Sequence, residues 1–393
     1  MTKNFTLLLV VSLLTCSVEV DLSVPSFPNI SNYFNISDSL TQMTIALNFF
    51  GFCLASGVYG PLSDAFGRRK VMIIGNAIML FGAVGCALAH SIEFLLFSRF
   101  IQGIGASTST VVSFAMIADV YSEEKSAQLV GTMNSLTTVF MSIAPIAGGF
   151  INESLGWRGN YTVIAVLSVI SWLMLYLWLP ETRNNLTPLR YKKISNDFKT
   201  LFLDKRFMLA SLVPSIFFAG WMSFVSCGSF LYMETYDLPI MYYALHQGCI
   251  IAVFSGVSLY SGKILQTIGE KNCVISGVIF TLLGSILMIT ISVILEKAPY
   301  LTSFSMILYS IGEAISYPVI FAKSLQIFPN IKGTAASVIM AMRSLLCAAF
   351  IAISSYIYSG QLITVAAMIL TASVLVSILS IKLLKSLPFA TKE

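Results

Sequence analysis

Twelve apolar stretches of about 20 residues alternate with short polar segments along the chain. Their approximate limits are 5–27, 42–62, 71–90, 93–116, 127–150, 160–180, 207–231, 241–262, 272–295, 300–322, 333–356 and 361–384. A helix of about 20 apolar residues is long enough to cross the hydrocarbon core of a bilayer. The pattern therefore predicts twelve transmembrane helices, and because most of the connections are short, consecutive helices should run antiparallel.

The composition agrees with an all-α integral membrane protein. Of the 393 residues, 56% are hydrophobic and 10% are charged, and the mean hydropathy is +0.85. Soluble globular domains carry about 25% charged residues. The one long connection, 181–206, divides the chain into an N-terminal six-helix bundle, 1–180, and a C-terminal one, 207–393. Its basic run is typical of a solvated cytoplasmic linker, and a lipid-binding or regulatory element is the alternative.

The basic residues are distributed unevenly between the two sets of loops. Arg158 and Lys297 fall in one set, Arg99 and Arg343 fall inside apolar stretches, and the rest of the 23 lysines and arginines lie in the other set or the tails. Loops rich in lysine and arginine stay in the cytoplasm. Both termini and the linker should therefore be cytoplasmic. Bases spread between membrane spans do not form a nucleic-acid surface, so no nucleic-acid partner is expected.

A short turn between the second and third spans carries a dense motif. Gly60, Asp64, Gly67, Arg68 and Arg69 fall at the positions of the loop between helices 2 and 3 of the major facilitator superfamily, which this stretch closely resembles. An ordinary cytoplasmic loop would account for the bases but not for Asp64 or the glycine spacing. The resemblance implies a gating role, and we expect the Asp64 carboxylate to contact a helix N-terminus or Arg68.

The second half of the chain contains a trace of the same motif. Gly262 and Gly269 repeat the spacing of Gly60 and Gly67, while Gln266 and Glu270 stand where the first copy has Asp64 and Arg68. A degenerate copy at this distance predicts two six-helix halves in parallel repeat. Transporters of this kind bind their substrates between the halves, near the middle of the bilayer.

The fourth span contains an arginine, which is expensive in lipid. Arg99, Gln102 and Gly103 share one helical face. A charge at the centre of a membrane costs about 2.5 kcal/mol or more, so Arg99 should face a polar cavity or a partner. The stretch resembles the second motif of the superfamily, which implies a part in proton coupling. A structural arginine that satisfies backbone carbonyls is the alternative.

The fifth span carries a stripe of small residues. Its members recur at steps of three and four, and they are Gly131, Ser135, Thr138, Ser142, Pro145 and Gly149. Such stripes mark places where two helices approach closely in a membrane. Pro145, Gly148 and Gly149 also resemble the motif of the antiporter branch, although Ala144 replaces its first glycine. Tight packing alone would produce the same stripe.

The first span contains two carboxylates. Asp21, followed by Pro25 and Pro28, resembles the first-helix signature of the bicyclomycin/chloramphenicol resistance group of drug–proton antiporters. Glu19 and Asp21 lie about 200° apart around a helix, so both cannot face the same cavity. The resemblance points to Asp21 as the acid in the central cavity, with Glu19 as the second candidate for proton coupling.

Weaker candidates lie in the second half. Phe217 and Trp221 on the seventh span could line an aromatic substrate cavity, although aromatic residues at helical spacing also simply pack. Glu313 is a further cavity candidate, and it either pairs with Arg343 or serves as a second proton site.

Taken together, the sequence predicts a secondary transporter and not an enzyme. The chain has no Gly-x-x-x-x-Gly-Lys-[Ser/Thr] loop for ATP, so we expect no cofactor or metal and a process driven by the proton gradient. The resemblance implies a monomer in the bacterial cytoplasmic (inner) membrane that exports small amphipathic compounds or drugs by alternating access. An inward proton-coupled metabolite symporter and a membrane sensor without transport are the alternatives.

Overall fold

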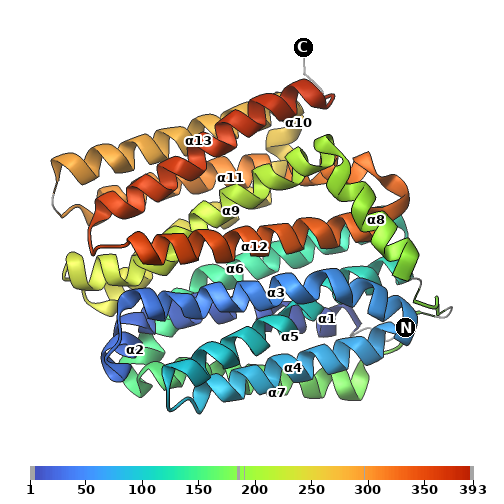
Figure 1. The fold of residues 1–393 in the computed structure, drawn as a ribbon, viewed down its shortest axis with the longest axis horizontal. Coiled ribbons are helices and arrows are strands. Elements are labelled where there is room, and N and C mark those ends of the chain that lie inside the picture. The colour runs from blue at the N-terminus through green and yellow to red at the C-terminus, as the bar shows by residue number, and fades with distance from the viewer. Residues whose placement is uncertain (1–4, 184–185, 190, 296, 390–393) are drawn as a thin grey trace.

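The computed structural model describes residues 5–183, 186–189, 191–295 and 297–389, and its regular structure in these ranges is entirely helical (Figure 1). The elements are α1 (Phe5–Ser23), η1 (Val24–Ser26), α2 (Phe27–Phe34), α3 (Asp38–Phe66), α4 (Arg68–Ala87), α5 (Ile92–Val120), α6 (Glu123–Leu155), α7 (Trp157–Trp178), α8 (Tyr191–Leu203), α9 (Lys205–Phe230), η2 (Leu231–Thr235), α10 (Ile240–Ile294), α11 (Pro299–Ile327), η3 (Pro329–Ile331), α12 (Lys332–Ile357) and α13 (Leu362–Ser386).

Eleven helices in the described ranges are long and apolar enough to cross a membrane. One of them, α10, has 55 residues, far more than the ~20 that one crossing needs. Its helical backbone is interrupted at Gly269, where φ is 80° and ψ is 164°, a conformation that favours glycine. Divided there, α10 supplies two spans, and the chain has the twelve spans that the hydropathy pattern predicts.

The structure differs from the sequence prediction at several helix ends and in the linker. Ser37 caps α3 by accepting a hydrogen bond from the Leu40 amide, so this helix begins at Asp38, earlier than predicted. The linker, predicted only as a connection, contains the helix α8. We missed α8 because its lysines dominate the stretch, although Phe198 and Leu201 lie on one side of it and pack inward.

The chain folds into two halves that repeat the same backbone turns. The first half comprises α1–α7 and the second comprises α9–α13, and they lie side by side in Figure 1. Gly67 and Gly269 have φ values of 95° and 80°, and Gly156 and Gly360 have φ values of 70° and 77°. We call the side with Gly67, Gly269 and α8 the basic face and the other side the opposite face.

The two halves meet along two pairs of helices, α3 with α12 and α6 with α10. In the second pair, a Cβ on Gly149 would lie 3.0 Å from the Cβ of Ala244. Closer to the basic face, the Ser255 hydroxyl donates a 2.9 Å hydrogen bond to the Thr138 carbonyl. Small side chains therefore allow α6 and α10 to approach closely over this length.

Beyond that hydrogen bond, α6 and α10 separate toward the basic face. Gly131 and Gly262 lie about two helical turns further along, each on the face that its helix presents to the other. In the described part of the chain, nothing lies within 4 Å of where a Cβ would sit on either residue. On the other side of the molecule, α3 and α12 stay close, because a Cβ on Gly60 would lie 3.5 Å from the Ser337 hydroxyl.

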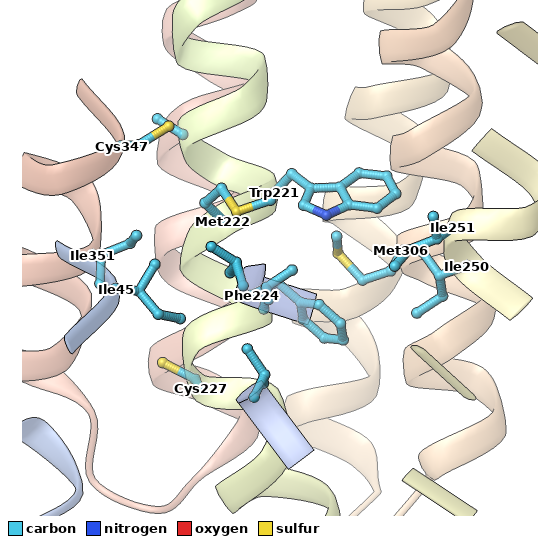
Figure 2. Close-up of a cluster of buried hydrophobic side chains, with 14 of the residues drawn as sticks. Ile45, Trp221, Met222, Phe224, Cys227, Ile250, Ile251, Met306, Cys347 and Ile351 are labelled. Atoms are coloured by element: carbon cyan, nitrogen blue, oxygen red, sulfur yellow. The ribbon is translucent and has the colours of Figure 1, made fainter. Parts of the chain in front are cut away.

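Near the opposite face the halves are in contact. The Phe27 and Phe230 rings are 6.3 Å apart, and the Cys227 thiol donates to the Gln42 side-chain oxygen at 3.4 Å. Figure 2 shows Ile45 of the first half among Trp221, Phe224 and other buried residues of the second. The seam between the halves is thus closed at the opposite face and parted between α6 and α10 at the basic face.

Candidate functional site

A charged cluster lies inside the first half, around Arg99 of α5. The Arg99 side chain is completely buried, and its Nη1 lies 3.8 Å from the Oε2 of Glu19 on α1. The same nitrogen donates to the Gln102 side-chain oxygen at 2.8 Å. Asn48 of α3 donates from its Nδ2 to the Glu19 Oε1 at 3.0 Å. Glu19 and Arg99 thus form an ion pair that two amide side chains hold in position.

Local sequence explains why this cluster can be buried. Gly103 lies one turn after Arg99, and a Cβ there would collide with the Asn48 carbonyl, so only glycine lets α3 and α5 come this close. The Tyr161 ring of α7 lies 5.9 Å from the guanidinium carbon and covers it from another side. These contacts of the Arg99 guanidinium are all with side chains. They favour the interpretation that Arg99 has a charged partner over the alternative that it satisfies backbone carbonyls.

The cluster is not saturated with hydrogen bonds. Within the described residues, the Nε and Nη2 of Arg99 and the Oε2 of Glu19 have no hydrogen-bond partner. Buried charges are costly unless they are paired and hydrogen-bonded. Within the described residues, the cluster therefore keeps donors and acceptors that are not used in this conformation.

Asp21 lies close to the other half of the molecule. Its side chain is buried, and neither carboxylate oxygen has a hydrogen-bond partner within the described ranges. The turn η1, which begins three residues after Asp21, contacts both α9 and α10. As the helical spacing predicts, Glu19 and Asp21 have different surroundings, and it is Glu19 that pairs with Arg99 although the resemblance ranks Asp21 first.

The predicted gating loop forms an ion-pair network at the basic face. Arg68 Nη2 lies 2.7 Å from the Asp64 carboxylate, as the prediction of an Asp64–Arg68 contact required. Arg68 Nε also pairs with Asp119 of α5 at 2.8 Å, and its Nη1 donates to the Ser63 hydroxyl. These partners all belong to the first half, so the network braces that half internally.

The N-terminus of α4 is capped by Glu181 and not by Asp64. The backbone amides of Arg68 and Arg69 donate to the two Glu181 oxygens at 3.0 and 3.1 Å. A carboxylate at this position is favoured by the partial positive charge of a helix N-terminus. Arg69 in turn donates from its side chain to the carbonyls of Leu179 and Tyr176. Sequence reasoning missed Glu181 because the contact joins the turn between α3 and α4 to the segment after α7, far away in the sequence.

The second half has a counterpart to this network with the charges exchanged. Glu270, which stands where the first copy has Arg68, pairs with Lys323 near the end of α11 at 2.9 Å. Lys323 occupies a position comparable to that of Asp119 near the end of α5. The degenerate copy of the motif therefore keeps an ion pair between equivalent helices, with the sign of each partner reversed.

The small-residue stripe of α6 packs between the two halves over most of its length. Pro145, Gly148 and Gly149 are buried, and a Cβ on Gly148 would collide with the Leu22 carbonyl of α1. Gly131 is exposed and has no such contact. The antiporter-like motif thus fits α6 between α1 and α10.

The aromatic candidates of α9 are packing residues. Phe217 lies against Tyr309 at 6.4 Å between ring centroids, and Trp221 lies against Phe254 at 5.3 Å. Both side chains are buried and pack against aromatic rings of the second half. Their neighbour Phe218, a further candidate on the same helix, lies 6.1 Å from Phe49 of the first half between ring centroids.

Glu313 and Arg343 do not form an ion pair among the described residues. The Arg343 guanidinium lies 3.5 Å from the centroid of the Phe218 ring, and its Nη1 donates to the Tyr317 hydroxyl at 3.3 Å. Glu313 is buried, and its Oε2 has no hydrogen-bond partner within the described ranges. The expected pairing is therefore not present in this conformation.

Two repeated helical halves, with buried ionisable groups inside one half and at the seam, define a polytopic membrane transporter. The family model of the Major Facilitator Superfamily matches residues 8–352, and the chain belongs to that family. Members of this family move solutes across membranes, so the protein is a transporter and not an enzyme.

Several curated relatives are drug-resistance proteins. The chain is 25% identical over 374 residues to a bicyclomycin resistance protein homolog of Haemophilus influenzae, covering 93% of this chain and 92% of that one. It is 26% identical over 366 residues to the chloramphenicol resistance protein CraA of Acinetobacter baumannii, covering 91% and 87%. It is 24% identical over 321 residues to the multidrug resistance protein MdtM of Escherichia coli, covering 81% and 78%.

Solved structures share the fold at lower identity. A D-xylose–proton symporter superposes with a TM-score of 0.76 at 17% identity, over 95% of this chain and 97% of that one. The human organic anion transporter MFSD10 superposes with a TM-score of 0.72 at 16% identity, over 97% and 99%. This likeness establishes the major facilitator fold.

Proposed function

We propose that the protein is a proton-coupled exporter of small amphipathic compounds, drugs among them, in the bacterial cytoplasmic membrane. The basic face would then be cytoplasmic, and the parted seam between α6 and α10 would make this an inward-facing conformation. The observation that carries the proposal is the pair of carboxylates on α1, one facing Arg99 inside the first half and one facing the seam. The drug-resistance relatives support the substrate class.

The two carboxylates suit different steps of such a cycle. Glu19 has a cationic partner, so its protonation would release Arg99 to the other side chains of the cluster. Asp21 is buried without a cationic partner among the described residues, and an ionised group is expensive in that setting. A proton on Asp21 would remove this cost, and its departure toward the basic face would favour the opposite conformation.

The available energy is sufficient for export. One proton returning down about 100 mV contributes about 2.3 kcal/mol, and each unit of pH gradient adds about 1.4 kcal/mol. A tenfold concentration ratio costs about 1.4 kcal/mol. Exchange of one proton for one neutral molecule could therefore maintain a gradient of roughly 100-fold.

The test uses purified protein in liposomes with an imposed pH gradient and chloramphenicol as the neutral probe. We expect movement of chloramphenicol opposite to the proton flux, abolished by a protonophore. Asp21→Asn should retain chloramphenicol binding but lose gradient-driven movement. Movement in the same direction as the protons would overturn export, and binding with no movement under any gradient would overturn transport of this probe.

A further inference from the structure

We propose that the outer side of α8, the helix of the linker, is a docking surface for the headgroups of anionic phospholipids. The outer side comprises Lys192, Ser195, Asn196, Lys199 and Leu203. It lies apart from the charged cluster around Arg99 and from the seam between α6 and α10. The proposal therefore does not depend on the substrate or on the direction of transport.

The inner side of α8 is occupied by the protein itself. The Phe198 ring lies 3.4 Å from where a Cβ on Gly57 of α3 would sit. Leu201 is completely buried in a cluster with residues of α9 and α12. Because packing already covers this side, a further partner can reach only the outer side.

The outer side is exposed and positively charged. Helical spacing places Lys192, Lys199 and Leu203 within about 40° of one another, opposite the buried side, and all three are exposed. Neither lysine forms an ion pair with any residue that the structure describes. Asp197, the acid of α8, points about 140° away from Lys192 around the helix. The charge of this side is therefore not neutralised and attracts anions.

Exposed apolar side chains place the end of α8 at the membrane surface. Leu203 is 70% exposed, and Phe202 beside it is 52% exposed. The span α9 begins at Lys205, and Asp204 caps it by accepting a 2.8 Å hydrogen bond from the Phe207 amide. Figure 1 shows α8 lying obliquely to the spans, between the ends of α9 and α3. Apolar side chains of a helix in this position can enter the layer just below the lipid headgroups.

The polar groups of the outer side suit a phosphodiester. A shallow hollow is lined by Lys192, Ser195, Asn196 and Lys199. Two ammonium groups, a hydroxyl and an amide can all donate hydrogen bonds to phosphate oxygens. Leu203 lies one turn beyond Lys199, where it can contact the upper part of an acyl chain.

The combination of charge and apolar exposure selects the partner. A zwitterionic headgroup carries an ammonium of its own, which the two lysines repel, so an anionic headgroup is preferred. An acidic soluble protein would match the charge but would leave Leu203 and Phe202 exposed beside a membrane span. An anionic phospholipid such as phosphatidylglycerol satisfies both features.

The experiment measures which lipid lies next to α8. Leu203→Cys in a cysteine-free background is labelled with bimane, an apolar fluorophore, and the protein is placed in phosphatidylcholine nanodiscs. A nitroxide near the top of an acyl chain quenches bimane on contact, and either phosphatidylglycerol or phosphatidylcholine carries it at the same mole fraction. We expect quenching by both lipids, and about threefold stronger quenching by phosphatidylglycerol. Lys192→Gln/Lys199→Gln should bring the two lipids to the same level.

Lys70→Gln/Lys125→Gln is the matched control. Both lysines are exposed near the basic-face ends of α4 and α6, so this variant removes the same charge from the same face at other helices. It should keep the preference for phosphatidylglycerol. Unchanged quenching by phosphatidylcholine shows, in each variant, that α8 stays at the membrane surface.

Three results would overturn the proposal. Equal quenching by the two lipids without the lysine substitutions would show that α8 does not distinguish headgroup charge. An equal loss of the preference in both double variants would assign it to the charge of the whole basic face. Quenching by neither lipid would show that the outer side of α8 faces water, as a surface for a soluble partner would. None of these measurements involves transport, so the proposed function is tested separately.

Discussion

Arg99 of α5 pairs with Glu19 of α1 at 3.8 Å, while Asp21, the next acid along the same helix, is buried three residues before η1, a turn that contacts α10 of the other half. The ion pair therefore lies inside a single half, where relative movement of the two halves need not break it. Such a movement would change the surroundings of Asp21. The same short segment of α1 thus carries a charge pair within one half and an acid close to the seam between the halves.

Removing the Glu19 charge should destabilise the protein more than removing the Asp21 charge. Glu19→Gln leaves Arg99 buried without its counter-charge, and breaking a buried pair in this way costs about 3–5 kcal/mol. Asp21→Asn removes a charge that has no cationic partner among the described ion pairs, so its cost should be small. Thermal unfolding in detergent measures both. The double variant Glu19→Gln/Arg99→Gln should recover much of the loss, and no recovery would show that the pair is not coupled.

The exchanged charges of the second half give a direct test of the ion pair between Glu270 and Lys323. Glu270→Lys and Lys323→Glu each place like charges together and should lower the rate of probe transport several-fold. The double swap restores an attractive pair and should recover most of the rate. Transport of chloramphenicol into liposomes is the measurement. A double swap as impaired as the single variants would mean that each residue acts through other contacts.

Gly131 and Gly262 should come together when the seam closes at the basic face. Both lie about two turns beyond the Ser255–Thr138 hydrogen bond, and neither has a close neighbour in this conformation. Gly131→Leu should therefore leave this conformation intact and disfavour the closed one. With spin labels at the basic-face end of α6 and in α10 just before Gly269, the short-distance population should disappear.

Gly149→Leu is the control for the seam glycines. A Cβ at Gly149 would lie only 3.0 Å from Ala244, so this change, unlike Gly131→Leu, should disturb the present conformation and lower thermal stability. If Gly131→Leu leaves the short-distance population unchanged, α6 and α10 do not close at that point.

The orientation in the membrane can be tested with cysteine labelling. Asn35 and Lys193 are both exposed, and they lie at the opposite and basic faces. In a cysteine-free background, a membrane-impermeant thiol reagent added to intact cells should label Asn35→Cys and not Lys193→Cys. Labelling of Lys193→Cys alone would reverse the orientation, and equal labelling of both would contradict the predicted topology.

The sequence by itself determined the spans and the repeat of the loop motif. Both follow from local chemistry, because a bilayer requires long apolar helices and a turn with positive φ requires glycine, as at Gly67 and Gly269. The Asp64–Arg68 contact was also predictable, since one turn of backbone separates the two residues. Helical spacing likewise predicted that Glu19 and Asp21 would have different surroundings.

Only the tertiary structure decided which partners these groups meet. Arg99 pairs with Glu19, Glu181 caps α4, and Lys323 takes the role that Asp119 has in the first half. Each of these contacts joins residues that lie dozens of positions apart in the sequence. The helical period fixes the direction in which a side chain points, but not which residue lies next to it. How close α1 and η1 come to α10 depends further on how the two halves pack, and that packing is set by small residues such as Gly149 and Ala244 meeting across the seam.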